Sequence, residues 1–173
     1  MPSYQHLAYR RNAKAAARKQ QIKKPKNVEL IQQAKEDFGF FCEYVADKPP
    51  AYHHKTWHQH FITNEDSTCL IKIAGPNVDL LAPRGSAKST VLGLLTAWAI
   101  GIHTEAKRPL QVLYLSYTVD IARSKSATIK RIIESKRYQE VFPKVRLLKN
   151  VTSNEYWSID HKFAGIDTTG EEQ

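Results

Sequence analysis

The sequence lacks the features that define secreted, disulfide-rich and membrane-spanning proteins. Its 173 residues include only two cysteines, Cys42 and Cys69, which excludes a disulfide framework and favours an intracellular protein. No apolar run approaches the roughly 20 residues that cross a bilayer, so we expect no membrane association. Hydrophobic residues make up 42% of the chain, which is enough for the core of one globular domain.

Acidic residues are missing from the first 28 positions, although the whole chain carries a formal net charge of +9. The basic residues there are Arg10, Arg11, Lys14, Arg18, Lys19, Lys23, Lys24 and Lys26. Because the rest of the chain is nearly neutral, residues 1–27 are predicted to form a basic arm, disordered or helical. This arm either contacts nucleic-acid phosphates or only keeps the chain in solution.

The most specific pattern lies between an apolar run at 78–81 and another at 91–102. It reads Ala82-Pro83-Arg84-Gly85-Ser86-Ala87-Lys88-Ser89-Thr90. A strand, a tight loop ending in Lys-Ser and a helix are the context of a phosphate-binding loop, where backbone N–H groups at a helix N-terminus bind phosphate. The alternative is an ordinary strand-to-helix turn that contains a Lys-Ser pair.

Glycine is scarce in this loop. Gly85 is the only one, and Ala82 and Ala87 stand where the usual pattern has glycine. Alanine adopts a positive φ at a cost, so we expect either another conformation at these positions or local strain. In a nucleotide site Lys88 would reach the β- and γ-phosphates, Ser89 would ligate Mg²⁺, and Arg84 would be a second cation beside the phosphates.

At these residues the chain resembles the ATPase domain of the large terminase subunit, the DNA-packaging motor of tailed bacteriophages. Several members carry a loop of the form P-R-G-x-x-K-S, and Pro83 to Ser89 is similar to it. A second block agrees in order and spacing: an apolar stretch at 111–117, Asp120-Ile121-Ala122, and Tyr138-Gln139-Glu140-Val141-Phe142-Pro143. The resemblance covers the chain from about residue 40 onward.

The resemblance implies ATP and Mg²⁺ as cofactors and a set of loop residues that bind them. These are Pro83, Arg84, Gly85, Ser86, Ala87, Lys88, Ser89 and Thr90, with Ser89 on Mg²⁺, Thr90 supporting a phosphate oxygen, and Arg84 coupling the γ-phosphate to movement. It also implies double-stranded DNA, a portal protein and a small terminase subunit as partners in the host bacterial cytoplasm. A homo-oligomeric ring is expected only of a completed motor.

Large terminases are longer and contain an apolar strand ending in Asp-Glu, followed by a nuclease domain. No such strand follows the loop here, so we interpret the chain as the front part of a motor in which ATP binding is expected and turnover stays open. In such a fragment, exposed strand edges predict a marginal or aggregation-prone fold.

Trp57 and Gln59 are similar to an aromatic-Gln element that contacts adenine in many motor ATPases. They belong to a histidine-rich stretch at 51–61, in which His54 and His58 have helical spacing. A metal site is the alternative use of these histidines, but no cysteine or carboxylate lies at ligand spacing beside them.

The expected fold class is α/β, a P-loop NTPase-type parallel sheet flanked by helices and incomplete. Residues 28–63 are predicted as a helical segment with one helix at 28–45, and 64–173 as a partial ATPase domain with strands at 69–74, 78–82 and 111–117. We predict a helix from Thr118 to about Ser135 with Ile121, Ile129, Ile132 and Ile133 inward, and a hairpin turning at Asp160-His161.

The basic residues on or beside the predicted 118–135 helix either line a DNA path or form a solvated face. They are Arg123, Lys125, Lys130, Arg131, Lys136 and Arg137. Rival functions are a nucleic-acid-binding fragment or prophage remnant without ATPase activity, and a small P-loop kinase, against which the unusual loop argues.

Overall fold

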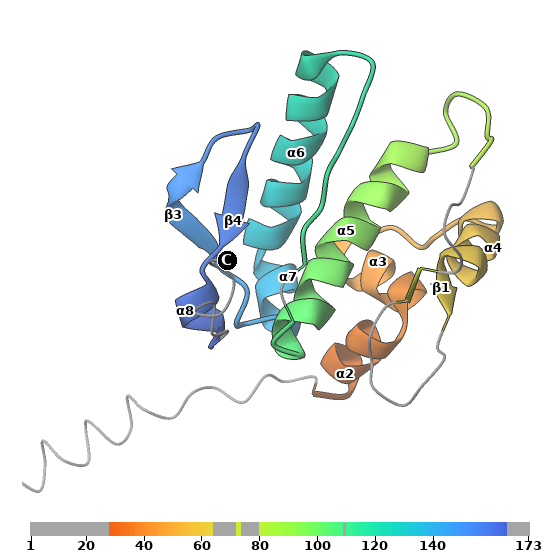
Figure 1. The fold of residues 1–173 in the computed structure, drawn as a ribbon. Coiled ribbons are helices and arrows are strands. Elements are labelled where there is room, and N and C mark those ends of the chain that lie inside the picture. The colour runs from red at the N-terminus through yellow and green to blue at the C-terminus, as the bar shows by residue number, and fades with distance from the viewer. Residues whose placement is uncertain (1–27, 64–71, 74–79, 109, 166–173) are drawn as a thin grey trace, which may run out of the picture. The chain divides into compact units, whose positions relative to one another are not determined.

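The structure is a computed structural model that describes residues 28–63, 72–73, 80–108 and 110–165 (Figure 1). Two units are distinguished, residues 1–30 and 31–173. Of the first unit, only residues 28–30 are described, and they begin a helix. The predicted basic arm, 1–27, therefore lies outside the described residues.

Helices make up most of the described chain. They are α2 (Val28–Glu36), α3 (Phe38–Ala46), α4 (Tyr52–Phe61), α5 (Lys88–Glu105), α6 (Val119–Glu134), α7 (Lys136–Val141) and α8 (His161–Ala164). The strands form two antiparallel pairs, β1 (Ile62–Thr63) with β2 (Lys72–Ile73), and β3 (Leu147–Thr152) with β4 (Trp157–Ile159). No parallel pair occurs among the described residues. Most of the predicted strand at 69–74 and the start of that at 78–82 lie outside them, so the parallel sheet stays a prediction.

One predicted strand is wrong. Residues 111–117 are described and have no regular secondary structure, and residues 80–82 are also irregular. A short apolar run becomes a strand only when neighbouring strands pair with its backbone, and no described strand lies beside this one.

The core forms where α5 packs against α3 and α6, with α7 against both α3 and α6. Helix α5 is apolar almost all round, as predicted for residues 91–102, and buries Leu94, Ala97 and Trp98. The rings of Phe41, Tyr138 and Phe142 meet at centroid distances of 5.3 to 6.1 Å. Tyr138 and Phe142, which belong to the second resemblance block, are therefore core residues.

The predicted single helix at 28–45 is wrong because the helix is interrupted at Asp37, which separates α2 from α3. Its backbone is extended, and its carboxylate accepts a hydrogen bond from the Phe40 N–H at 2.9 Å, so Asp37 is the N-cap of α3. The Trp98 indole N–H donates to the Ala34 carbonyl at 3.1 Å and ties α2 to α5. A local capping interaction thus ends a periodic pattern that by itself indicates one helix.

The predicted helix after Thr118 is confirmed. Thr118 caps α6 by accepting from the Ile121 N–H at 3.3 Å, and the helix ends at Glu134 with Ser135 as its C-cap. Ile129 and Ile133 are buried and Ile132 packs against the core, whereas Ile121 is 44% exposed and was wrongly predicted to face inward. Ile121 lies in the first turn, outside the stretch of α6 whose residues are buried.

The predicted hairpin at Asp160-His161 is also wrong. Residues 157–159 pair instead with β3, and the Asp160 carboxylate accepts from the Phe163 N–H at 3.0 Å to cap the short helix α8. The capping geometry of aspartate outweighs its turn propensity here.

Candidate functional site

The predicted phosphate loop connects irregular backbone at 80–82 to the first turn of α5. Residues 83–86 form a turn in which the Ser86 Oγ donates to the Pro83 carbonyl at 2.8 Å and the Ser86 N–H lies 3.4 Å from the same oxygen. Gly85 has a φ of +84°. This is a conformation that glycine adopts without steric cost.

Ala87 also has a left-handed conformation, with φ 57° and ψ 21°. It is the N-cap of α5, and its carbonyl accepts from the Thr90 and Val91 N–H groups at 2.9 and 3.0 Å. The sequence left open whether Ala87 avoids this conformation or carries strain, and strain is the outcome. An L-residue in this region costs about 1–2 kcal/mol.

Lys88 is the first residue of α5 and its side chain turns back across the loop. The ammonium group donates to the Ala82 carbonyl, six residues earlier, and the side chain is part-buried. Ser89 is half-buried beside it, while Thr90 and Arg84 are exposed. The loop therefore combines a helix N-terminus with a lysine that spans it, an arrangement that attracts anions.

Helix α4 contacts the loop through His54. The imidazole Nε2 lies 2.9 Å from the Ser86 carbonyl oxygen, and the ring packs against His53 and Trp57 at centroid distances of 4.1 and 5.2 Å. Trp57, predicted to contact adenine, thus meets His53 edge-on and His54 at a tilt. Gln59 belongs to α4, and its side chain lies outside what the structure describes.

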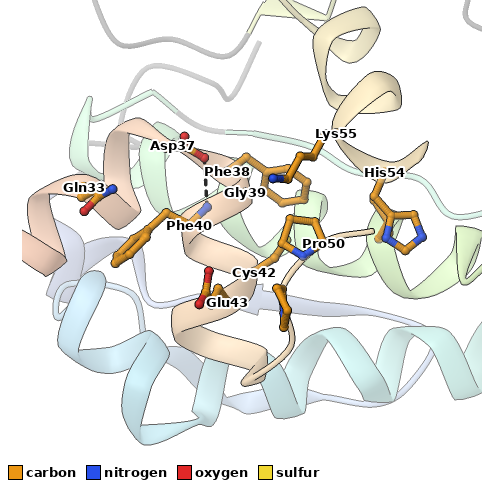
Figure 2. A pocket seen from close by; sticks show the side chains of 12 residues that line it. Gln33, Asp37, Phe38, Gly39, Phe40, Cys42, Glu43, Pro50, His54 and Lys55 are labelled. Carbon is orange, nitrogen blue, oxygen red and sulfur yellow. Dashed lines mark hydrogen bonds between the residues drawn. The ribbon is translucent and has the colours of Figure 1, made fainter. Parts of the chain in front are cut away.

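A pocket of about 380 Å³ lies between α3 and α4 and reaches the first turn of α5 at Val91 (Figure 2). Its wall includes Phe38 and Pro50, His54 and Lys55 of α4, and Val91 from the first turn of α5. Asp37, Glu43, Gln33, Gly39, Phe40, Cys42 and Pro49 complete the lining. Figure 2 shows His54 and Lys55 on one side and the α3 residues on the other.

The pocket wall is chemically inert at Cys42. Burial, and then the negative charge of Asp37, raises the pKa of this thiol to about 12, so it stays protonated at neutral pH. Among the described residues no group of three or more His, Cys, Asp or Glu side chains could hold a metal ion. The His58 side chain, part of the alternative metal reading, lies outside that description.

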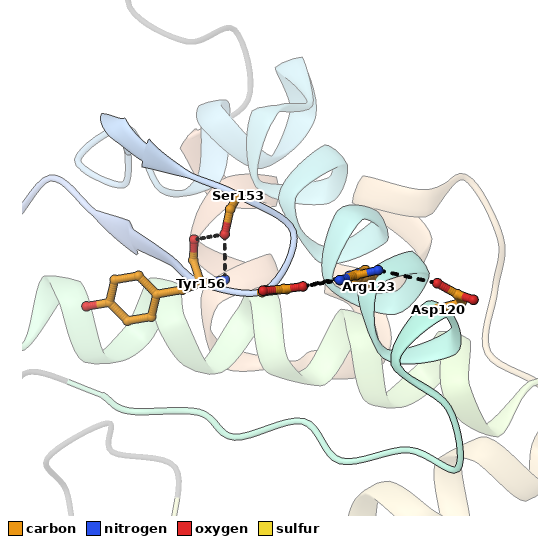
Figure 3. A network of polar contacts seen from close by, with 5 residues as sticks. Asp120, Arg123, Ser153 and Tyr156 are labelled. Atoms are coloured by element: carbon orange, nitrogen blue, oxygen red, sulfur yellow. Dashed lines mark hydrogen bonds and ion pairs between the residues drawn. The ribbon is translucent and has the colours of Figure 1, made fainter.

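Several of the cations on or beside α6, predicted either to line a DNA path or to form a solvated face, make contacts within the protein. Arg123 pairs with Glu155 and lies 3.5 Å from Asp120 (Figure 3), and Arg137 pairs with Asp47 at 2.8 Å. Lys130 donates to the Ser153 carbonyl at 3.2 Å, in the turn where Ser153 and Tyr156 bond each other. These contacts link α6 and α7 to the β3–β4 hairpin and to the end of α3, and they reduce the positive charge available to a ligand.

Sequence reasoning missed the part played by His54 and the pocket. The contact between His54 and Ser86 joins positions 32 residues apart, and no spacing rule indicates it. The available signal was only that the histidine-rich stretch precedes the loop.

No family model, curated protein or solved structure matches this chain. Within the described residues no helix is long and apolar enough to cross a membrane.

Proposed function

We propose that this chain is the ATP-binding portion of a phage terminase large subunit, which powers packaging of double-stranded DNA into proheads. The observation that carries the proposal is the Lys88 side chain spanning a loop that ends in a left-handed residue at a helix N-terminus. This is the arrangement in which a lysine and backbone N–H groups bind the phosphates of a nucleotide.

In this proposal Lys88 leaves the Ala82 carbonyl and binds the β- and γ-phosphates. Ser89 would ligate Mg²⁺, which neutralises phosphate charge, and Thr90 would support a phosphate oxygen. Arg84 is exposed in the turn and forms no ion pair with another described residue, so its guanidinium is available to the γ-phosphate.

The pocket between α3 and α4, which His54 links to the loop, suits the nucleoside part of the ligand. Its volume is at the small end of the range for ligand pockets, about 300–1,000 Å³. Asp37 and Glu43 bring negative charge that disfavours phosphate but accepts hydrogen bonds from the amino group of a base. Phe38, Pro50 and Val91 supply apolar surface for a ring.

Catalysis is not part of the proposal for this chain alone. Hydrolysis needs a residue that positions water, and the described residues near the loop offer no carboxylate in contact with it. The packaging partners that the resemblance implies, namely DNA, a portal and a small terminase subunit in the host cytoplasm, belong to the same proposal.

Binding of a fluorescent ATP analogue with Mg²⁺ tests the proposal. We expect Lys88→Ala to weaken binding about ten- to a hundredfold, because one charge-assisted contact to phosphate is lost. Lys136→Ala, on an exposed lysine of α7, is the matched control and should bind like the wild type. A folded wild-type chain that binds no nucleotide would refute the proposal.

A second candidate function is a nucleic-acid-binding fragment without nucleotide chemistry. The basic, acid-free segment at 1–28 favours it. It predicts salt-sensitive DNA binding that is equal in the wild type and Lys88→Ala, with and without ATP, and that is lost when the eight basic residues are replaced by glutamine.

A further inference from the structure

His54 makes two hydrogen bonds of opposite polarity. Its Nε2 lies 2.9 Å from the Ser86 carbonyl oxygen, which can only accept, so Nε2 carries the proton. Its Nδ1 lies 3.2 Å from the Ala51 backbone N–H, which can only donate, so Nδ1 is unprotonated. Both bonds exist together only in the neutral tautomer protonated at Nε2.

The bond to Ser86 determines the orientation of a peptide group in the phosphate loop. In a trans peptide the carbonyl and the following N–H point in opposite directions, and no described peptide bond is cis. Because the Ser86 carbonyl points at His54, the Ala87 N–H points away from α4. Ala87 is also the residue with the strained left-handed conformation, which persists only where surrounding contacts impose it.

We propose that His54 is a positioning residue of the phosphate loop: through Nε2 it holds the Ser86–Ala87 peptide so that the Ala87 N–H is turned to the phosphate of a bound nucleotide. This rests on the proposed nucleotide site. Packing against His53 and Trp57 keeps the ring in place, and the same ring lines the pocket, so one side chain links the loop to the pocket.

Two conservative variants separate this role from a merely structural one. The glutamine side-chain amide extends as far as Nε2 of histidine, so His54→Gln keeps a donor for Ser86 but loses the acceptor for Ala51. The shorter asparagine amide corresponds to Nδ1, so His54→Asn keeps the acceptor for Ala51 but cannot reach Ser86. Equivalent substitutions of Tyr52, an 87% exposed residue of α4, are the matched controls.

The measurement is affinity for a fluorescent ATP analogue with Mg²⁺, beside the thermal unfolding midpoint of each full-length variant. We expect His54→Asn to bind about five- to tenfold more weakly than the wild type, and His54→Gln to stay within about twofold. We also expect adenosine alone to bind both variants equally, because it carries no phosphate.

The opposite order, with His54→Asn like the wild type and His54→Gln impaired, would overturn the proposal. It would show that the role of His54 is to accept the hydrogen bond from Ala51 at the start of α4. Equal nucleotide affinity of all three chains would overturn it too, while leaving the nucleotide site intact. Failure of the folded wild type itself to bind would refute the proposed function, and the positioning role with it, and is distinguishable from both other results.

Discussion

Two residues of the loop share an unusual backbone conformation but differ in side chain. Gly85 has a φ of +84° and Ala87 a φ of +57°. Glycine adopts this region freely, whereas the Cβ of alanine crowds the backbone there. The phosphate-loop pattern has glycine at the position of Ala87, and here alanine adopts a backbone conformation that glycine would adopt without strain.

Substituting glycine for Ala87 and alanine for Gly85 tests whether the backbone of Ala87 is strained. We expect Ala87→Gly to raise the free energy of unfolding by about 0.5–1 kcal/mol, because the strain is relieved and only partly offset by greater freedom of the unfolded chain. Gly85→Ala should lower it by about 1 kcal/mol although no atom lies within 4 Å of the added Cβ. Urea unfolding measures both changes, and a destabilised Ala87→Gly variant would show that Ala87 is not strained.

Helix α5 packs closely against Phe142 at one of its two glycines. It carries two glycines, Gly93 and Gly101, that a helix would normally disfavour. A Cβ added at Gly101 would lie 2.6 Å from Phe142 Cγ, inside any normal contact, whereas one at Gly93 would lie 3.7 Å from Ile129 Cγ1. Gly101 is therefore required by the approach of Phe142, which follows α7.

The two glycines predict opposite results for the same substitution. Gly101→Ala should destabilise the chain by about 1–3 kcal/mol, because Phe142 is fully buried and cannot move aside without disturbing the aromatic core. Gly93→Ala should be neutral or stabilise by up to about 1 kcal/mol, because alanine favours the helix and its methyl group fits. Similar unfolding midpoints for both variants would contradict the α5–Phe142 packing.

At the scale of the whole molecule, an exposed apolar segment precedes α6. Leu113, Leu115 and Tyr117 are 80 to 97% exposed. Within the described chain, no backbone hydrogen bond is formed by residues 110–117. Extended apolar backbone that finds no hydrogen-bond partner among the described residues favours association.

We therefore expect the purified chain to self-associate as its concentration rises. The double variant Leu113→Gln/Leu115→Gln should reduce association without changing net charge, because both side chains are exposed on the folded chain. Lys149→Gln on β3 changes charge but not apolar area and is the comparison. Light scattering after size-exclusion chromatography measures the mass, and a wild-type chain that stays monomeric at all concentrations would contradict the expectation.

Local signals predicted the parts of the fold that local interactions stabilise. Helix α5 follows from a run that is apolar almost all round, and α6 from the Thr118 cap and its apolar periodicity. Local signals gave wrong predictions at Asp37 and Asp160, because an aspartate is compatible with a helix interior, a turn or a helix cap. In the structure each of the two aspartates caps a new helix.

The candidate site divides in the same way. By itself, the sequence determined which residues form the loop, that an apolar helix follows it, and that a positive φ at Ala87 would be strained. Only the tertiary structure decided that Ala87 accepts this strain, that Lys88 turns back to Ala82, and that His54 bonds Ser86. The physical reason is that spacing and capping act over a few residues, whereas these contacts depend on how α4 and α5 meet the loop in space.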